Sequence, residues 1–180
     1  MLVGLTGRNA SGKSTLVEWF SSKGLRSVSC SDSIRSWLSE QGIEITRDAL
    51  IEGGRNLRRE GGPGVLAEML LDFLDGEDAV VDSIRTPAEV EALRGRGDFF
   101  LIEVRADEEA RWKRLVARGR SGDPMEKSAF LAQQAAEEHA EDESGQALAA
   151  TGSMADISIH NDGSLEDLEE ELEEVWSGLS

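Results

Sequence analysis

The chain has 180 residues, of which 39% are hydrophobic and 31% charged, and its net charge at neutral pH is −17. This length and apolar content are typical of one globular domain and exclude a disordered chain. The negative charge argues against nucleic acid or an anionic membrane as a partner, because both repel an acidic protein.

Membrane and export signals are also missing from the sequence. No run approaches the roughly 18 apolar residues of a membrane-spanning helix, and the first apolar stretch is too short for a signal peptide. The single cysteine, Cys30, cannot form an internal disulfide. We therefore expect a cytoplasmic protein, whose oligomeric state the sequence leaves open.

The first motif lies close to the amino terminus. Residues 7–14 read GRNASGKS, the G-x-x-x-x-G-K-[ST] pattern of a phosphate-binding loop, between an expected strand (1–6) and an expected helix (from 15). Lys13 is expected to reach the β- and γ-phosphates, and the Ser14 hydroxyl to bind Mg²⁺. The expected ATP-phosphate contacts are Gly7, Asn9, Ala10, Ser11, Gly12, Lys13, Ser14 and Thr15.

Strands and helices alternate along the rest of the chain. Further strands are predicted at 25–30, 78–82, 99–104 and 155–159, and helices at 32–41, 46–60, 63–75, 107–117 and 125–143. Two more helices are expected, one capped by Thr86 with Pro87 at its first position, and one with an apolar stripe from Leu165 to Trp176. This pattern predicts a three-layer α/β/α P-loop NTPase fold with a five-stranded parallel sheet, in a single domain.

Ligands of such sheets bind beyond the carboxyl ends of the strands. Asp82 ends the third predicted strand, where a carboxylate can hold Mg²⁺ through water; the alternative is that it only caps the next turn. Asp32 follows the second strand and either caps the next helix or acts as the catalytic base for an attacking hydroxyl. A phosphate acceptor would need no base, and Asp32 would then hold the substrate or the waters of the metal.

Arginines gather in two other segments despite the acidic composition. Arg55, Arg58 and Arg59 are three and four residues apart and are expected on one helix face, within a substrate-binding helical region at about 31–75. Arg85 follows the third strand and can hold an acceptor phosphate bidentately. The predicted acceptor site consists of Asp32, Arg35, Arg55, Arg58, Arg59 and Arg85.

The second arginine group predicts a small mobile lid at about 111–124. Arg118 and Arg120 lie in an Arg-Gly-Arg-Ser-Gly-Asp segment, and we expect both to be catalytic by stabilising the charge of the migrating phosphoryl group. Arg111 and Arg114 share a helix face with Arg118, but surface ion pairs with the abundant carboxylates are their expected role.

The phosphate loop, followed by Ser29-Cys30-Ser31-Asp32, resembles dephospho-coenzyme A kinases and the related nucleoside monophosphate kinases. The resemblance implies that Asp32 is the base, that Arg118-Gly119-Arg120 belongs to the lid, and that Arg118, Asn161, Asp162 and Gly163 lie near the adenine of ATP. Asp82-Ser83-Ile84-Arg85 is instead closer to the turn by which adenylate-type kinases hold the acceptor phosphate. With residues 56–67, it also resembles P-loop kinase-like domains of archaea and of deoxycytidylate deaminase fusions.

The sequence therefore predicts a P-loop kinase that uses ATP and Mg²⁺. Its most probable acceptor is a small, nucleotide-like molecule such as a nucleoside or deoxynucleoside monophosphate. Dephospho-coenzyme A, phosphorylated at its 3′-hydroxyl, is the alternative acceptor. An ATP-binding regulatory or sensing module with little turnover is the alternative from another functional class.

Overall fold

The computed structural model describes residues 1–119, 123–139 and 147–179 and contains one five-stranded sheet. The strands are β1 (Leu2–Thr6), β2 (Arg26–Ser29), β3 (Ala79–Asp82), β4 (Phe99–Arg105) and β5 (Ile157–His160). Their order is β2-β3-β1-β4-β5 and every pairing is parallel. The predicted fold class is confirmed, because helices connect and cover these strands in three layers.

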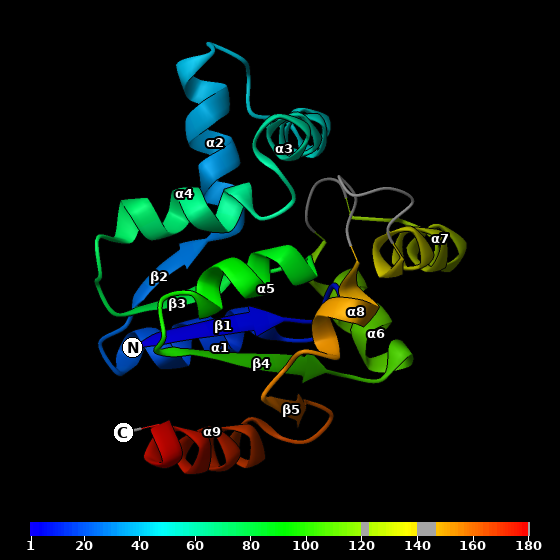
Figure 1. Ribbon diagram of the computed structural model, residues 1–180. Helices are drawn as coiled ribbons and strands as arrows, with labels where there is room; N and C mark the ends of the chain where they lie inside the picture. The colour runs from blue at the N-terminus through cyan, green and yellow to red at the C-terminus, as the bar shows by residue number, and fades with distance from the viewer. Residues whose placement is uncertain (120–122, 140–146, 180) are drawn as a thin grey trace.

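Two apolar clusters cover the two faces of the sheet. Val3 and Leu5 of β1 pack with α1 (Lys13–Ser22) and α9 (Leu165–Leu179), whereas Leu2 packs on the opposite side with α4 (Val65–Leu74) and α5 (Pro87–Arg94). Successive side chains of a strand point to opposite faces, so this alternation divides the core between the two layers. Figure 1 shows α9 below the sheet and α5 above it.

The remaining helices lie at the periphery. They are α2 (Cys30–Glu40), α3 (Arg47–Gly61), α6 (Glu108–Arg118), α7 (Lys127–Glu138) and α8 (Leu148–Gly152). Figure 1 shows α2 and α3 projecting from the sheet, while α6, α7 and α8 gather near the end of β1 from which the phosphate loop leaves. The carboxyl edge of the sheet is thus enclosed by segments far apart in the sequence.

Several boundaries differ from the sequence prediction. The helix predicted from Pro63 begins at Val65, because Gly62 has a φ of 94° and Gly64 is the N-cap. The helix predicted over 125–143 begins at Lys127 and ends at Glu138; residues 140–143 lie outside the described part of the chain. The short helix α8 was not predicted. In the described ranges, no helix is both long and apolar enough to cross a membrane.

Candidate active site at the carboxyl edge of the sheet

The phosphate loop joins β1 to α1 and requires its two motif glycines. Gly7 and Gly12 have φ angles of 136° and 102°, which side chains other than glycine rarely adopt. A Cβ atom on Gly7 would lie 2.3 Å from the Val104 carbonyl oxygen, and one on Gly12 would lie 2.0 Å from Asn161 Nδ2. Close packing against β4 and the segment after β5 therefore fixes the shape of the loop.

The hydrogen bonds of the loop leave several amides available. Among the described residues, the main-chain N–H groups of Ala10, Gly12, Lys13 and Ser14 have no hydrogen-bond acceptor, although this loop opens helix α1. Amides at a helix N-terminus, together with the helix dipole, attract anions. The loop therefore has the donors that a phosphate chain requires.

Lys13 folds back over the loop. Its Nζ donates hydrogen bonds to the carbonyl oxygens of Gly7, at 2.7 Å, and Arg8, at 3.0 Å. Burial lowers the pKa of the Lys13 ammonium to about 8; Arg85 and Arg118 also lower it, while Asp82 and Glu137 oppose the effect. A negatively charged ligand beside Lys13 would raise this pKa again, because it favours the charged ammonium.

A cleft of about 390 Å³ opens beside the loop. This volume lies within the usual range for small-molecule sites. Its lining residues are Ala10, Gly12, Ser14, Thr15, Arg114, Arg118, Asn161, Gly163, Leu165 and Leu168. Arg118, Asn161 and Gly163, which the sequence placed near adenine, do line this cleft. Asp162 does not; its Oδ1 accepts a hydrogen bond from the Asp107 amide at the start of α6.

Oxygen atoms suited to a metal lie at the ends of β3 and of the phosphate loop. The Oδ1 atom of Asp82 is buried and accepts no hydrogen bond from any residue in the described ranges. Burial of a carboxylate oxygen without a partner costs free energy of folding. The Ser14 hydroxyl is exposed at the cleft. Carboxylate and hydroxyl oxygens are hard ligands of the kind that Mg²⁺ prefers, so Asp82 and Ser14 have the donor chemistry that a magnesium ion requires.

The arginines of α6 contact the phosphate loop, which corrects the prediction of surface ion pairs for Arg111 and Arg114. Arg111 is 1% exposed and donates from Nη1 to the Asn9 carbonyl at 3.5 Å. Arg114 donates to the carbonyls of Ser11, at 3.4 Å, and Asn161, at 2.6 Å. Their spacing with Arg118 was the available signal; the sequence did not show which surface that face of α6 covers.

Arg118 connects the cleft to the start of the predicted lid. Its guanidinium makes two hydrogen bonds to the carboxylate of Asp123, at 2.7 and 2.8 Å, and a third to Asn9 Oδ1 at 2.9 Å. Arg118 thus lies beside the phosphate loop and lines the cleft, while its catalytic role stays a prediction. Arg120, the second predicted lid arginine, lies outside the described residues.

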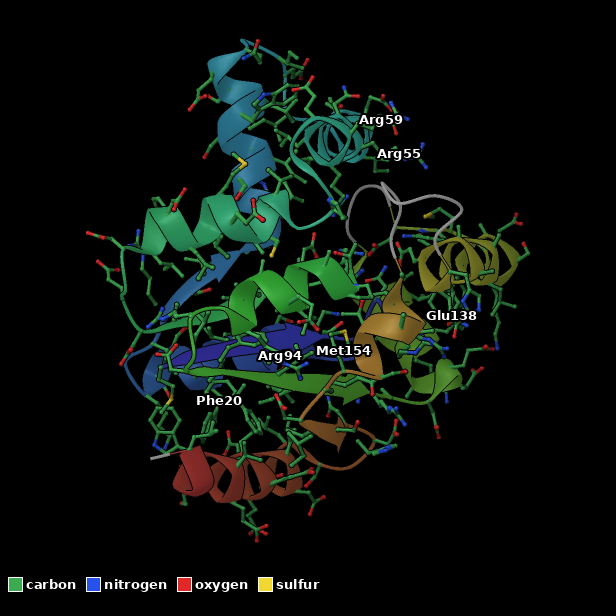
Figure 2. All side chains as sticks on the ribbon, in the orientation of Figure 1. Phe20, Arg55, Arg59, Arg94, Glu138 and Met154 are labelled. Atoms are coloured by element: carbon green, nitrogen blue, oxygen red, sulfur yellow. The ribbon has the colours of Figure 1, made fainter. Side chains whose placement is uncertain are left out.

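Helix α7 adds carboxylates that the sequence analysis missed. Glu138 pairs with Arg8 of the phosphate loop, and Figure 2 shows Glu138 on the side of α7 that faces α6. Glu137 lies close enough to Lys13 to raise its pKa. Residues 137–143 read as a solvated acidic run, so nothing in the sequence indicated that α7 lies over the loop.

The predicted acceptor residues are only partly brought together. The three arginines share one side of α3, but Arg58 is buried and pairs with Glu89 at 2.9 Å, whereas Arg55 and Arg59 are exposed. Figure 2 shows Arg55 and Arg59 leaving α3 on the side away from α2. Helical geometry explains the split, because adjacent residues such as Arg58 and Arg59 point about 100° apart.

Glu89 also fixes the position of Arg85. The Glu89 Oε2 atom accepts hydrogen bonds from the amides of Arg85, at 2.8 Å, and Thr86, at 3.2 Å, while Oε1 accepts from Arg58. Thr86 is the N-cap and Pro87 the first residue of α5, as the sequence predicted. The half-buried Arg85 is near enough to Lys13 to lower its pKa, which places it at the same edge as the phosphate loop.

Asp32 takes part in the capping box of α2, in which Ser29 is the N-cap. Capping of this helix is one of the roles that the sequence predicted for Asp32. Its Oδ2 accepts from the Ser29 amide at 2.8 Å, and its Oδ1 pairs with Arg35 at 3.0 Å. Both side chains remain about half exposed. Ser29 lies opposite Asp82 in the pairing of β2 with β3, so the capping carboxylate is close to the candidate metal site.

Comparison with known proteins assigns the chain to a family. A UPF0200 protein of Thermococcus gammatolerans is 32% identical over 192 residues, covering 100% of this chain and 98% of the relative. A UPF0200 protein of Methanothrix thermoacetophila is 37% identical over 124 residues, 68% of each chain. The chain belongs to the UPF0200 family. Residues 3–155 also match the family described as AAA domain, to which the chain likewise belongs.

Solved structures support the fold at lower identity. TT1252 from Thermus thermophilus covers 100% of this chain and 98% of its own, with a TM-score of 0.67 and 23% identity. The alignment with shikimate kinase from Bacteroides thetaiotaomicron covers 99% of this chain and 98% of the kinase, with a TM-score of 0.63 and 15% identity. The chain therefore has a P-loop kinase-like fold.

Proposed function

We propose that this protein is an ATP-dependent phosphotransferase that moves the γ-phosphate of Mg-ATP to a small, nucleotide-like acceptor, as nucleoside monophosphate kinases do. One observation carries the proposal: amides of Ala10, Gly12 and Ser14 without acceptors in the described structure belong to residues that line a ligand-sized cleft. Shikimate kinases and a sugar kinase among the similar structures add fold-level support.

In this proposal, the loop amides and Lys13 bind the phosphate chain, and Lys13 leaves its present carbonyl partners to do so. Ser14 and Asp82, the latter through water, would hold Mg²⁺, which when bound would supply neutralisation of phosphate charge. Arg118, already bonded to Asn9, stabilises negative charge on the migrating group. The base of the nucleotide lies in the cleft near Leu165 and Leu168.

The acceptor binds on the α2–α3 side of the same edge. Arg85 is the strongest candidate to hold an acceptor phosphate, because it lies near Lys13. Arg58 supports the site from its buried position, and Arg35, Arg55 and Arg59 supply exposed positive charge.

A hydroxyl acceptor, as in dephospho-coenzyme A, is the second candidate, and the position of Asp32 favours it. The Asp32 carboxylate is about half exposed and lies near Asp82 by way of Ser29, so it can take a proton from an attacking hydroxyl. A phosphate acceptor needs no such base.

The test is a phosphotransfer screen with radiolabelled Mg-ATP, using nucleoside and deoxynucleoside monophosphates and dephospho-coenzyme A as acceptors. We expect label on at least one acceptor, with Lys13→Ala reducing the rate by at least about 100-fold. Lys113→Ala, an exposed cation on α6, is the matched control. Tight ATP binding without transfer to any acceptor would instead indicate a sensing module.

A further inference from the structure

Arg111 is the largest fully buried side chain among the described residues. It is 1% exposed, and burial of a guanidinium normally requires a carboxylate partner, because an uncompensated charge is costly away from water. The sequence placed this residue on the surface. Its burial against the phosphate loop therefore calls for a specific explanation.

All of its partners in the described structure are neutral. Nε donates to the Ala106 carbonyl at 3.1 Å, Nη1 to the Asn9 carbonyl at 3.5 Å, and Nη2 to Oε1 of Gln134. The guanidinium also lies over the Phe130 ring, 5.3 Å from its centroid. No carboxylate of the described ranges forms an ion pair with it.

The charges around Arg111 do not compensate its own. Glu108, Glu138 and Asp162 attract the Arg111 guanidinium from beyond contact distance. Glu138, however, forms an ion pair with Arg8, and the positive charge of Arg8 repels Arg111. Burial, followed by Arg8, lowers the pKa of Arg111 from its usual value. The surroundings thus hold a cation with no counter-ion at contact distance.

The contact with Asn9 links this charge to the anion site. The carbonyl of Asn9 belongs to the same peptide unit as the N–H of Ala10, an amide with no acceptor among the described residues. A cationic donor on the carbonyl polarises the peptide and strengthens the N–H as a donor. Arg111 can therefore act on a bound phosphate without touching it.

We propose that Arg111 is a positioning residue whose missing counter-charge is the polyphosphate chain of the bound nucleotide. The residue raises the positive potential of the phosphate loop, and its burial is tolerated because binding of a polyanion compensates it. The inference depends on the nucleotide site of the proposed function but not on any acceptor. It predicts that Arg111 favours ligands whose β- and γ-phosphates occupy the phosphate loop.

The experiment replaces Arg111 with methionine, an apolar side chain of similar length, and measures Kd by calorimetry for Mg-ATP, Mg-ADP and AMP. We expect Arg111→Met to weaken Mg-ATP by about tenfold or more and AMP by less than about twofold, because AMP has no β- or γ-phosphate to lie in the phosphate loop near Arg111. The melting temperature without nucleotide should stay equal or rise, because a buried cation is replaced by an apolar group. Lys113→Met removes the same charge from an exposed position of α6 and should change none of these values.

Arg111→Lys keeps a cation but loses the planar fork that bonds Ala106, Asn9 and Gln134, and it should lose less Mg-ATP affinity than Arg111→Met. The proposal is overturned if Arg111→Met fails to fold, if it weakens ATP and AMP equally, or if Arg111→Lys loses as much affinity as Arg111→Met. If the unaltered protein binds no Mg-ATP, the proposed function itself fails. If it binds Mg-ATP and Arg111→Met binds equally well, only the role of Arg111 fails.

Discussion

The donor side and the acceptor side of the candidate site are built differently. Around the phosphate loop, polar contacts join residues far apart in the sequence: Asn161 Nδ2 donates to the Ser11 carbonyl at 2.9 Å, 150 residues away, and Arg118 reaches Asn9 across 109 residues. On the acceptor side, Asp32 and Arg35 bond to residues three or four positions away. Long-range contacts thus hold the donor site, whereas on the acceptor side Asp32 and Arg35 bond locally and the buried Arg58–Glu89 pair is the long-range contact described above.

This difference shows which side is preorganised. Long-range contacts fix the loop shape before ligand arrives, so a nucleotide finds its amides in place. Local pairs on exposed helices can exchange partners at small cost, since exposed ion pairs contribute little to stability. Asp32 and Arg35 can therefore rearrange around a substrate, while the phosphate loop cannot change without losing its shape.

The largest effect is expected from Gly12→Ala. A Cβ atom there meets Asn161 Nδ2 at 2.0 Å, so the loop must move and Mg-ATP affinity should fall by at least about 100-fold. Gly24→Ala is a matched control, because Gly24 also has a positive φ of 99° but nothing lies within 4 Å of its Cβ position. Both variants should lose about 1 kcal/mol of stability from backbone strain. Equal ATP binding by the two, measured by calorimetry, would contradict a preorganised loop.

Asp32→Asn tests the acceptor side. The amide oxygen of asparagine can still accept the Ser29 N–H bond, so the melting temperature and the Kd for Mg-ATP should change little. If the acceptor is a hydroxyl, the turnover number should fall by about 100-fold, because the base is lost. An unchanged turnover number with the best acceptor would restrict Asp32 to its capping role.

Asn161→Ala should have an intermediate effect on the donor side. It removes the hydrogen bond to the Ser11 carbonyl, and we expect Mg-ATP to bind about tenfold more weakly. Arg35→Ala, which breaks only local bonds on α2, should leave the Kd for Mg-ATP unchanged. Similar losses of ATP affinity in the two variants would remove the distinction between the two sides.

The smallest effect is a proton linkage at Lys13. Its pKa of about 8 in the nucleotide-free protein lies below the ordinary value of 10.5, and bound phosphates should raise it by favouring the charged form. At a pH between 8 and 10.5, binding of Mg-ATP should therefore be accompanied by uptake of a proton at Lys13. The affinity for Mg-ATP should fall about fivefold from pH 8 to pH 9. Calorimetry in two buffers of different ionisation enthalpy measures the uptake. At pH 7 the uptake should approach zero; equal uptake at pH 7 and pH 9 would show that another group is responsible.

Much of the fold and of the donor site could be predicted because the information is local. The phosphate loop is one contiguous motif, the strands are short apolar runs, and Thr86-Pro87-Ala88-Glu89 forms a cap within four residues. The prediction failed for Arg111, Arg114 and Glu138. Their spacing showed which residues share a helix face, but the surface that each face covers depends on how α6 and α7 pack.

The sequence by itself determined the parallel P-loop fold, the loop glycines and the position of Asp82 at the end of β3, since these follow from backbone conformation and strand patterning. Only the tertiary structure decided that Arg111 is buried, that Arg58 turns to Glu89 while its neighbours face solvent, and that Asn161 meets the loop. Those outcomes depend on contacts between segments distant in the sequence. No local pattern encodes them, because burial and pairing of a charge are properties of the assembled core rather than of the residue that carries it.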